Sequence, residues 1–328
     1  MIPEFSVVIP TCQHPASLLK CLDALGRQRL ARELFEVIVV DDGNSSDTAT
    51  AVALFRRQVA QSGGALEVRY LAQEQPRGYA AARNRGWRAA RGRVIAFTDD
   101  DCLPQPDWLP SALTSFRRGA QVVTGQLRLT LPDSTTQYDL KTRYLEIGEF
   151  ISANCFCRKS ALERVGGFEE AFDSAWREDS DLQFNFIRMG IPISKCLQAV
   201  VVHPMQEMPW YTSLANERNS RYDALLYKRH PDLFRQRIET DRSLILEYYA
   251  SVLAIGIGIM GGLFRNPALA TVGFSLWAVV SANLIWKRLP TNVVARQLPQ
   301  TVLTTLATPF LAVYWRLYGA IKYRVLYW

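Results

Sequence analysis

Three consecutive aspartates, Asp99, Asp100 and Asp101, follow the apolar run at residues 93–97. Carboxylates crowded at the end of a buried strand repel one another, so a compensating partner is expected. Carboxylates at positions i and i+2 can direct two oxygens to one site, and a divalent cation that prefers oxygen ligands would cancel the repulsion. The alternative is a solvated or capping turn before a helix that starts near Asp107. The position behind an apolar strand favours the metal site.

A second acidic turn, DDGNSSD at residues 41–47, follows another apolar run. Asp41 or Asp42 could accept hydrogen bonds from a ribose or a base, as acidic residues behind such strands do in nucleotide-binding sheets. A turn without a ligand is an equally good interpretation, because Gly43 permits the turn and a serine could cap the next helix. No Walker-type loop and no G-x-G-x-x-G motif follows the first strand, which disfavours P-loop and dinucleotide-binding proteins.

Two further groups could complete a site. The segment WREDSDL at residues 176–182 places Asp179 and its acidic neighbours at a predicted helix start, where they suit the helix dipole. One of them could also act as a general base on a hydroxyl group. His203 follows an apolar run and could either complete the ligand set of a cation or serve a structural role.

Six arginines lie within residues 76–93. An arginine that reaches the strand-end site could bind a diphosphate through two hydrogen bonds. A solvated helix face is the better interpretation for most of them, and Arg83 and Asn84 are the exceptions. Covalent hydrolase chemistry is unsupported, since no G-x-S-x-G motif or Cys–His pair is identifiable. The six cysteines lack zinc-type spacing and no secretory signal is found, so reduced cytosolic thiols are expected.

Alternating strands and helices must position these residues. The pattern predicts strands at residues 5–10, 35–40, 66–71 and 93–97, separated by helices at 16–28, 47–60 and 78–91. Such βαβ units form a parallel sheet with right-handed crossovers, and ligands bind beyond the carboxyl ends of the strands. After residue 105 the pattern is mixed, with strands predicted at 121–129, 151–159 and 195–204 and a helix at 180–190.

Taken in order, these segments resemble glycosyltransferase family 2, inverting enzymes of the GT-A fold that use nucleotide-sugar donors. The matching segments cover about residues 5–205 and are specific as an ordered set: SVVIPT (6–11), VIVVDDGNSSD (37–47), RGYAAARNRGW (77–87), FTDDDC (97–102), GGFEE (166–170) and REDSDL (177–182). The resemblance implies an α/β fold, a GT-A (Rossmann-like) mixed sheet flanked by helices.

The resemblance also implies roles for matching residues. Asp99 and Asp101 would form the D-x-D pair, with Asp101 the direct ligand of Mn²⁺ or Mg²⁺ and His203 a further ligand. Asp179 would be the catalytic base, and GGFEE would belong to the acceptor-side loop. Asp42, or alternatively Asp41, would contact the nucleoside. The predicted nucleotide-sugar-binding residues are Pro10, Thr11, Asp41, Asp42, Arg83, Asp99 and Asp100, the last without an assigned role as the middle residue of the motif.

The net charge of +7 is concentrated in the tail. Residues 1–240 carry 30 Lys and Arg against 29 Asp and Glu, whereas residues 241–328 carry 8 against 2, so no nucleic-acid partner is expected. The apolar segments 244–264 and 268–286 are long enough to cross a bilayer and are separated only by RNP, which predicts a transmembrane hairpin. A buried hairpin in a soluble core is the alternative, but basic and aromatic flanks favour the membrane.

The basic flanks place the catalytic domain on the cytoplasmic side of the cell (inner) membrane by the positive-inside rule. Segment 301–321 contains Pro309 and Arg316, so an interfacial or re-entrant helix fits better than a third span. The predicted domains are a GT-A catalytic domain at 1–205, a basic helical linker at 206–243 and a membrane region at 244–328.

The expected function is therefore metal-dependent, inverting transfer of a hexosyl group from a nucleotide sugar to a hydroxyl of a lipid-linked or cell-envelope glycan. The membrane tail alone motivates the lipid-linked acceptor. A nucleotidyltransferase, which also uses strand-end aspartates and a metal, is the main alternative, although no Gly-rich basic loop follows the first strand. An inactive GT-A scaffold is the non-enzymatic alternative. The sequence leaves the donor, the acceptor and the oligomeric state open.

Overall fold

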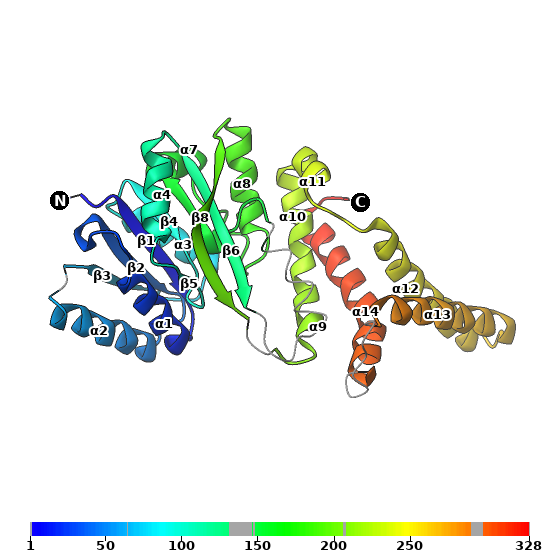
Figure 1. Cartoon of the computed structure of the whole chain (residues 1–328). Coiled ribbons are helices and arrows are strands. Elements are labelled where there is room, and N and C mark those ends of the chain that lie inside the picture. Colours follow the sequence, from blue (N-terminus) through cyan, green and yellow to red (C-terminus); the bar gives the residue numbers. More distant parts are fainter. Residues whose placement is uncertain are drawn as a thin grey trace. The chain divides into compact units, whose positions relative to one another are not determined.

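The structure is a computed structural model of the 328-residue chain, and it describes residues 2–63, 65–130, 146, 148–205, 208–289 and 298–327. Two compact units divide the chain, Met1–Glu207 and Met208–Trp328 (Figure 1). The first unit holds all the predicted site residues.

A mixed β-sheet forms the centre of the first unit. Its eight described strands lie in the order β3-β2-β1-β4-β7-β6-β8-β5. Their bounds are β1 Phe5–Thr11, β2 Phe35–Asp41, β3 Glu67–Ala72, β4 Val94–Phe97, β5 Leu103–Pro104, β6 Val122–Thr130, β7 Cys155–Arg158 and β8 Ile193–Pro204. The strands β3, β2, β1 and β4 are parallel, whereas β7 runs antiparallel to both β4 and β6.

The parallel strands carry their carboxyl ends to one edge of the sheet. Thr11 at the end of β1 lies opposite Asp41 at the end of β2, and Phe97 at the end of β4 lies opposite Val8. The segments that follow β1, β2 and β4 are therefore neighbours in space although they are far apart in sequence. This register is what gathers the acidic clusters.

Helices cover both faces of the sheet, as the continuous apolar strands require. The helices described in this unit are α1 Pro15–Gly26, α2 Ser46–Gln61, α3 Tyr79–Ala89, α4 Trp108–Arg117, α7 Lys159–Val165 and α8 Glu178–Arg188. Alternate residues of β1 and β2 face opposite sides, so Val7 and Val37 pack with α1, α2 and α4, while Val8 and Ile38 pack with α3, α7 and α8.

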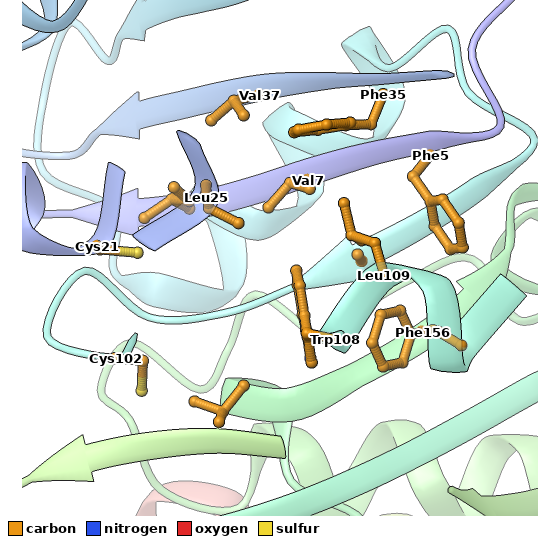
Figure 2. Close-up of a cluster of buried hydrophobic side chains, with 14 of the residues drawn as sticks. Phe5, Val7, Cys21, Leu25, Phe35, Val37, Cys102, Trp108, Leu109 and Phe156 are labelled. Atoms are coloured by element: carbon orange, nitrogen blue, oxygen red, sulfur yellow. The ribbon is translucent and has the colours of Figure 1, made fainter. Parts of the chain in front are cut away.

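Aromatic residues fill the first of these two cores (Figure 2). The ring of Phe156 lies 4.8 Å from the ring of Trp108 and 6.2 Å from that of Phe5, measured between centroids. Leu25 of α1 and Cys21 contribute to the same cluster. This core joins the parallel strands to the antiparallel part of the sheet.

Most sequence predictions for this unit match an observed element, and one needs correction. The strand predicted at 151–159 is shorter, because Ser152–Asn154 forms a 3₁₀ turn before β7. The side chain of Asn154 accepts a hydrogen bond from Trp108 Nε1 (2.8 Å) and donates to the carbonyl oxygen of Ala199 (2.9 Å). These tertiary hydrogen bonds take the place of strand pairing, and the sequence pattern did not reveal them.

The second unit is helical over the residues that the structure describes. After α9 Thr212–Asn216, the turn η3 Glu217–Ser220, α10 Arg221–Arg229 and α11 Pro231–Arg237 come the long helices α12 Arg242–Leu263, α13 Pro267–Arg288 and α14 Leu298–Tyr323. The predicted segment 301–321 lies within α14.

Helices α12 and α13 form a tightly packed hairpin. Asp241 and Asn266 cap their first turns through the backbone N–H groups of Leu244 (3.0 Å) and Leu269 (3.1 Å). A Cβ atom added at Gly273 would lie 2.2 Å from the backbone nitrogen of Gly258, so only glycine permits this approach. Both helices are long and apolar enough to cross a membrane, each with a mean hydropathy of 1.7.

Candidate active site

The turn after β2 is held by its own two aspartates. Asp41 accepts hydrogen bonds from the N–H groups of Gly43 (2.9 Å) and Ser45 (2.8 Å) and from the hydroxyl of Tyr70 (2.7 Å). With no exposed surface, Asp41 is committed to the turn. The nucleoside contact of Asp42, or alternatively of Asp41, stays a prediction.

Asp42 also orders the chain that enters α3. Its carboxylate accepts hydrogen bonds from the N–H groups of Arg77 (2.8 Å) and Gly78 (2.9 Å) and from the Gln73 side chain. Gly78 has φ +89°, and a Cβ there would lie 2.4 Å from the carbonyl oxygen of Asp173, so glycine is required. Asp42 Oδ2 accepts only one of these bonds and keeps acceptor capacity for a further donor.

Asp100 is the most buried of the three consecutive aspartates. The hydroxyl of Thr11 donates to Asp100 Oδ2 at 2.5 Å, and His14 Nδ1 lies 3.4 Å from the same oxygen. Burial, together with the charges of Asp101 and Asp99, raises the pKa of Asp100 to about 6 against the hydrogen bond from Thr11. The middle residue of the motif, which had no assigned role, thus ties the end of β4 to the end of β1. Pro10, the residue before Thr11, is buried within β1.

Arg83 of α3 lies between two carboxylates. Its Nη2 is 2.7 Å from Asp99 Oδ1 and its Nη1 is 3.2 Å from Glu178 Oε1, with only 1% of the side chain exposed. Burial alone would lower the pKa of the guanidinium, but the charges of Asp99 and Glu178 raise it. Each terminal nitrogen makes one of these contacts, and Arg83 Nε is buried without a hydrogen-bond partner in the described part of the chain. The diphosphate contact of Arg83 stays a prediction.

Glu178 and Asp179 open helix α8. Burial, and next the charge of Asp179, raise the pKa of Glu178 to about 8, although Arg83 lowers it. Burial also raises the pKa of Asp179, while the N–H of Ser180, 2.6 Å from Asp179 Oδ1, and Arg177 lower it. Two adjacent carboxyls of this kind hold a proton at a pH where isolated carboxyls have lost it. Glu178 is not among the site residues predicted from the sequence. Its position next to Asp179 in the REDSDL segment could have indicated it.

Asp101 and His203 form a second pair at the same edge of the sheet. Asp101 Oδ2 lies 3.4 Å from His203 Nε2, and one potential ligand atom each from Asp101, Cys102 and His203 lies within 4.8 Å of the others. Asp101 Oδ1 and His203 Nδ1 are buried and find no hydrogen-bond partner in the described part of the chain. Burial raises the pKa of Asp101, and His203 lowers it.

Asp101, Cys102 and His203 could each offer one ligand atom to a divalent cation. Burial raises the pKa of the Cys102 thiol well above its usual range, whereas a bound cation would favour the thiolate. Asp99 belongs with Arg83 instead, and it is not part of the group formed by Asp101, Cys102 and His203. The structure thus brings Asp101 and His203 together and places Asp99 Oδ1 at Arg83. The metal-binding pair of Asp99 and Asp101 stays a prediction.

Asn84 connects α3 to the GGFEE loop. Its side chain accepts a hydrogen bond from Phe168 N (2.9 Å) and donates to Phe168 O (2.8 Å) and to Glu170 Oε1 (2.8 Å). Glu170 also pairs with Arg77 (2.7 Å) and Arg88 (3.2 Å). Consecutive residues of α3 therefore hold the start of α8, through Arg83, and the loop that precedes it, through Asn84.

Three of the five non-glycine residues with positive φ in the described part of the chain lie next to these residues. Gln13, Asn44 and Arg177 have φ angles of +60°, +48° and +74°, in the left-handed region that non-glycine residues rarely adopt. They follow β1, follow β2 and precede α8, respectively. Such strain persists where the surrounding structure imposes it, and it clusters at functional sites.

Comparison with known proteins places this arrangement in a family. The family model described as glycosyl transferase family 2 matches residues 6–170, half of the chain, and the chain belongs to this family. The family membership predicted from the ordered motifs is therefore confirmed.

Individual relatives share parts of the chain. It is 33% identical over 178 residues to glycosyltransferase AglE of Haloferax volcanii, covering 51% of this chain and 56% of that protein. It is 30% identical over 233 residues to validoxylamine A glucosyltransferase of Streptomyces hygroscopicus subsp. jinggangensis, covering 59% and 53%. The chain thus spans about half the length of these curated relatives.

A solved structure has the same fold. The mannosyltransferase PcManGT from Pyrobaculum calidifontis, in complex with GDP-Man and Mn²⁺, superimposes with a TM-score of 0.59 at 19% identity. The match covers 97% of this chain and 88% of that one. The predicted GT-A fold, a mixed sheet flanked by helices, is confirmed.

Replacing Arg83 should destabilise the first unit strongly. Arg83→Met leaves Asp99 and Glu178 without their shared cation, and breaking a buried ion pair costs about 3–5 kcal/mol. Urea unfolding followed by tryptophan fluorescence measures the loss. Arg85→Met, the same change two residues along α3, is the control. Equal losses in the two variants would contradict the role assigned to Arg83.

The raised pKa of Glu178 predicts a pH-dependent stability. The folded chain retains a proton on Glu178 that the unfolded chain releases near pH 4.5, so this residue's contribution to stability falls as pH rises from about 4.5 to about 8. The unfolding free energy of wild type minus that of Glu178→Gln should therefore decrease across this window. Glu163→Gln, at an exposed position of α7, controls for the substitution itself. A difference that stays flat or rises with pH would refute the prediction.

Proposed function

We propose that this chain is a metal-dependent, inverting glycosyltransferase that moves a sugar from a nucleotide-sugar donor to an acceptor hydroxyl. One observation carries the proposal: Arg83 links Asp99, beside the cation-competent pair, to Glu178, beside the candidate base Asp179. Membership of glycosyl transferase family 2 supports the same chemistry.

Asp101 and His203 would hold the metal ion. Their buried atoms without partners among the described residues, Asp101 Oδ1 and His203 Nδ1, support a site built for a further ligand. A mixed oxygen and nitrogen donor set suits Mn²⁺ better than Mg²⁺, which prefers oxygen ligands and keeps much of its water. Mn²⁺ is also the ion in the PcManGT complex. A bound ion would neutralise the negative charge that develops on the leaving nucleoside diphosphate.

Asp179 would accept the proton of the acceptor hydroxyl. Burial raises the pKa of Asp179, which strengthens it as a base, while Ser180 and Arg177 lower that pKa and favour the carboxylate form. A base that activates the hydroxyl on the face of the sugar opposite the leaving group gives a single displacement with inversion. Arg83 would keep the donor side and the base side at a fixed separation.

On the donor side, Asp42 would contact the nucleoside through the acceptor capacity left on its Oδ2. Pro10, Thr11 and Asp100 would form the wall of the donor site at the end of β1, where His14 also lies. Asp99 would stay paired with Arg83 and act through it. These assignments rest on geometry and on the motif positions.

Helices α12 and α13 would anchor the chain in the cell (inner) membrane, with the catalytic unit in the cytoplasm and a lipid-linked or cell-envelope acceptor. Protein covers little of either helix: 28% and 17% of their most apolar stretches are buried. A hairpin in a soluble core would be covered. Leu253 and Val279 are 64% and 67% exposed. Glu247, the one acid within α12, is neutralised by Lys287 of α13.

Removing the carboxylate of Asp101 should abolish metal-dependent donor binding. Asp101→Asn is expected to weaken Mn²⁺ binding at least about tenfold, because the variant loses the carboxylate and keeps only His203 of the two proposed ligands. Isothermal titration with Mn²⁺, alone and with UDP or GDP, measures this. Asp47→Asn, which removes an exposed carboxylate after β2, should bind as wild type does. Wild-type affinity in Asp101→Asn would rule out the proposed ligand.

Removing the base should separate turnover from binding. A screen of UDP-, GDP- and dTDP-sugars with Mn²⁺ or Mg²⁺, with and without membrane lipid extract, identifies the donor. Release of nucleoside diphosphate indicates sugar transfer, whereas release of pyrophosphate would indicate nucleotidyl transfer. Asp179→Asn should then bind that donor normally while its turnover falls about 10²–10⁴-fold. Unchanged turnover would disprove the assignment of Asp179.

A further inference from the structure

Helix α14 carries a row of exposed apolar and aromatic side chains. Its members are between 39% and 77% exposed: Leu303, Tyr314, Leu317, Tyr318 and Ile321. The last four follow the i, i+3, i+4, i+7 spacing of a single helix face. These five residues are called the α14 stripe.

Packing within the second unit fixes the direction of this stripe. Ala312 and Val313 of α14 are buried in one cluster with Tyr248 of α12 and Leu284 of α13. Thr305 and Thr308 are also buried, with 1% and 2% exposed. One face of α14 therefore packs against α12 and α13, and the α14 stripe remains exposed.

The charged base of the α12–α13 hairpin is joined to the middle of α14. Arg288, at the end of α13, donates from Nη1 to the hydroxyl of Thr308 (3.1 Å) and from Nη2 to the hydroxyl of Tyr248 (2.7 Å). Lys287 lies in the last turn of α13, and Arg242 is the first residue of α12, so both lie at the open end of the hairpin. If the hairpin is inserted, its basic ends lie among lipid headgroups, and α14 is held at that level.

The side chains around the stripe suit an anionic bilayer surface. Residues 298–328 carry three basic residues and no acidic one. The Lys322 ammonium lies 6.0 Å from the ring centroid of Tyr318, and the rings of Tyr314 and Tyr318 stack at 6.3 Å. Tyrosines beside lysines, with an apolar body and a polar end, are typical of the membrane–water interface.

We propose that the α14 stripe lies on the surface of an anionic bilayer, with Lys322 and Arg324 against lipid phosphates. The proposal rests on the proposed anchorage by α12 and α13 but concerns different residues. It assigns to the chain a preference for anionic over zwitterionic lipid, because basic side chains near an anionic surface each strengthen binding about fivefold. This contribution adds to that of the basic residues at the ends of α12 and α13.

Photo-crosslinking of the full chain tests this. p-Benzoylphenylalanine is placed at position 318 and, in a separate protein, at position 279 of the hairpin, and each is reconstituted in phosphatidylcholine vesicles with or without phosphatidylglycerol. Position 318 should form lipid adducts several-fold more efficiently with phosphatidylglycerol, and added salt should remove the difference. Position 279 should form lipid adducts equally in both vesicles.

A charge variant provides the second measurement. Lys322→Gln with Arg324→Gln should reduce lipid adducts at position 318 roughly tenfold or more in phosphatidylglycerol vesicles. Arg117→Gln with Arg118→Gln, an equal charge change at exposed positions of the first unit, should leave them unchanged.

The outcomes separate the two proposals. Lipid adducts at 279 without any at 318, or adducts from 318 to residues 1–207 or to a second copy of the chain, would overturn the role of the stripe and leave the anchorage standing. Equal adducts at 318 in both vesicles would overturn the anionic preference. Adducts at 318 without any at 279 would overturn the anchorage and leave the stripe.

Discussion

A buried arginine organises the first unit. Arg83 carries a positive charge into a buried position, where Asp99 and Glu178 lie on either side of it. Asp99 comes from the segment after β4, and Glu178 comes from the start of α8. The contacts that this one cation requires therefore bring the two segments together.

The remaining contacts of the site follow from that arrangement. With Asp99 held by Arg83, Asp101 is left to pair with His203, and Asp100 is turned toward Thr11. Asn84, the next residue along α3, holds the GGFEE loop by backbone-like hydrogen bonds to Phe168. One helix thus positions the segment after β4, the start of α8 and the loop before it, and the strained backbone at Arg177 lies where these constraints meet.

The second unit obeys a different constraint. Close backbone approach at Gly258 and Gly273 brings α12 and α13 together without large side chains, so the apolar residues remain on the outside. Two polar pairs join the helices near the open end of the hairpin, Lys287 with Glu247 and Arg288 with Tyr248. The hairpin thus exposes apolar side chains along its length and has polar pairs at its open end. The α14 stripe adds further exposed apolar and aromatic side chains.

The sequence by itself determined the order of the elements, the family and the positions of the acidic clusters. These depend on local periodicity and on short motifs: Val7, Val8 and Ile9 form a buried strand wherever that strand is placed, and DDGNSSD forms a turn whatever it binds. Which carboxylate partners which group was decided only by the tertiary structure. Asp99, Asp100 and Asp101 are equivalent in sequence, yet they face Arg83, Thr11 and His203, residues 16, 89 and about a hundred positions away. The energy of a buried charge depends on neighbours supplied by distant segments, and no local pattern encodes them.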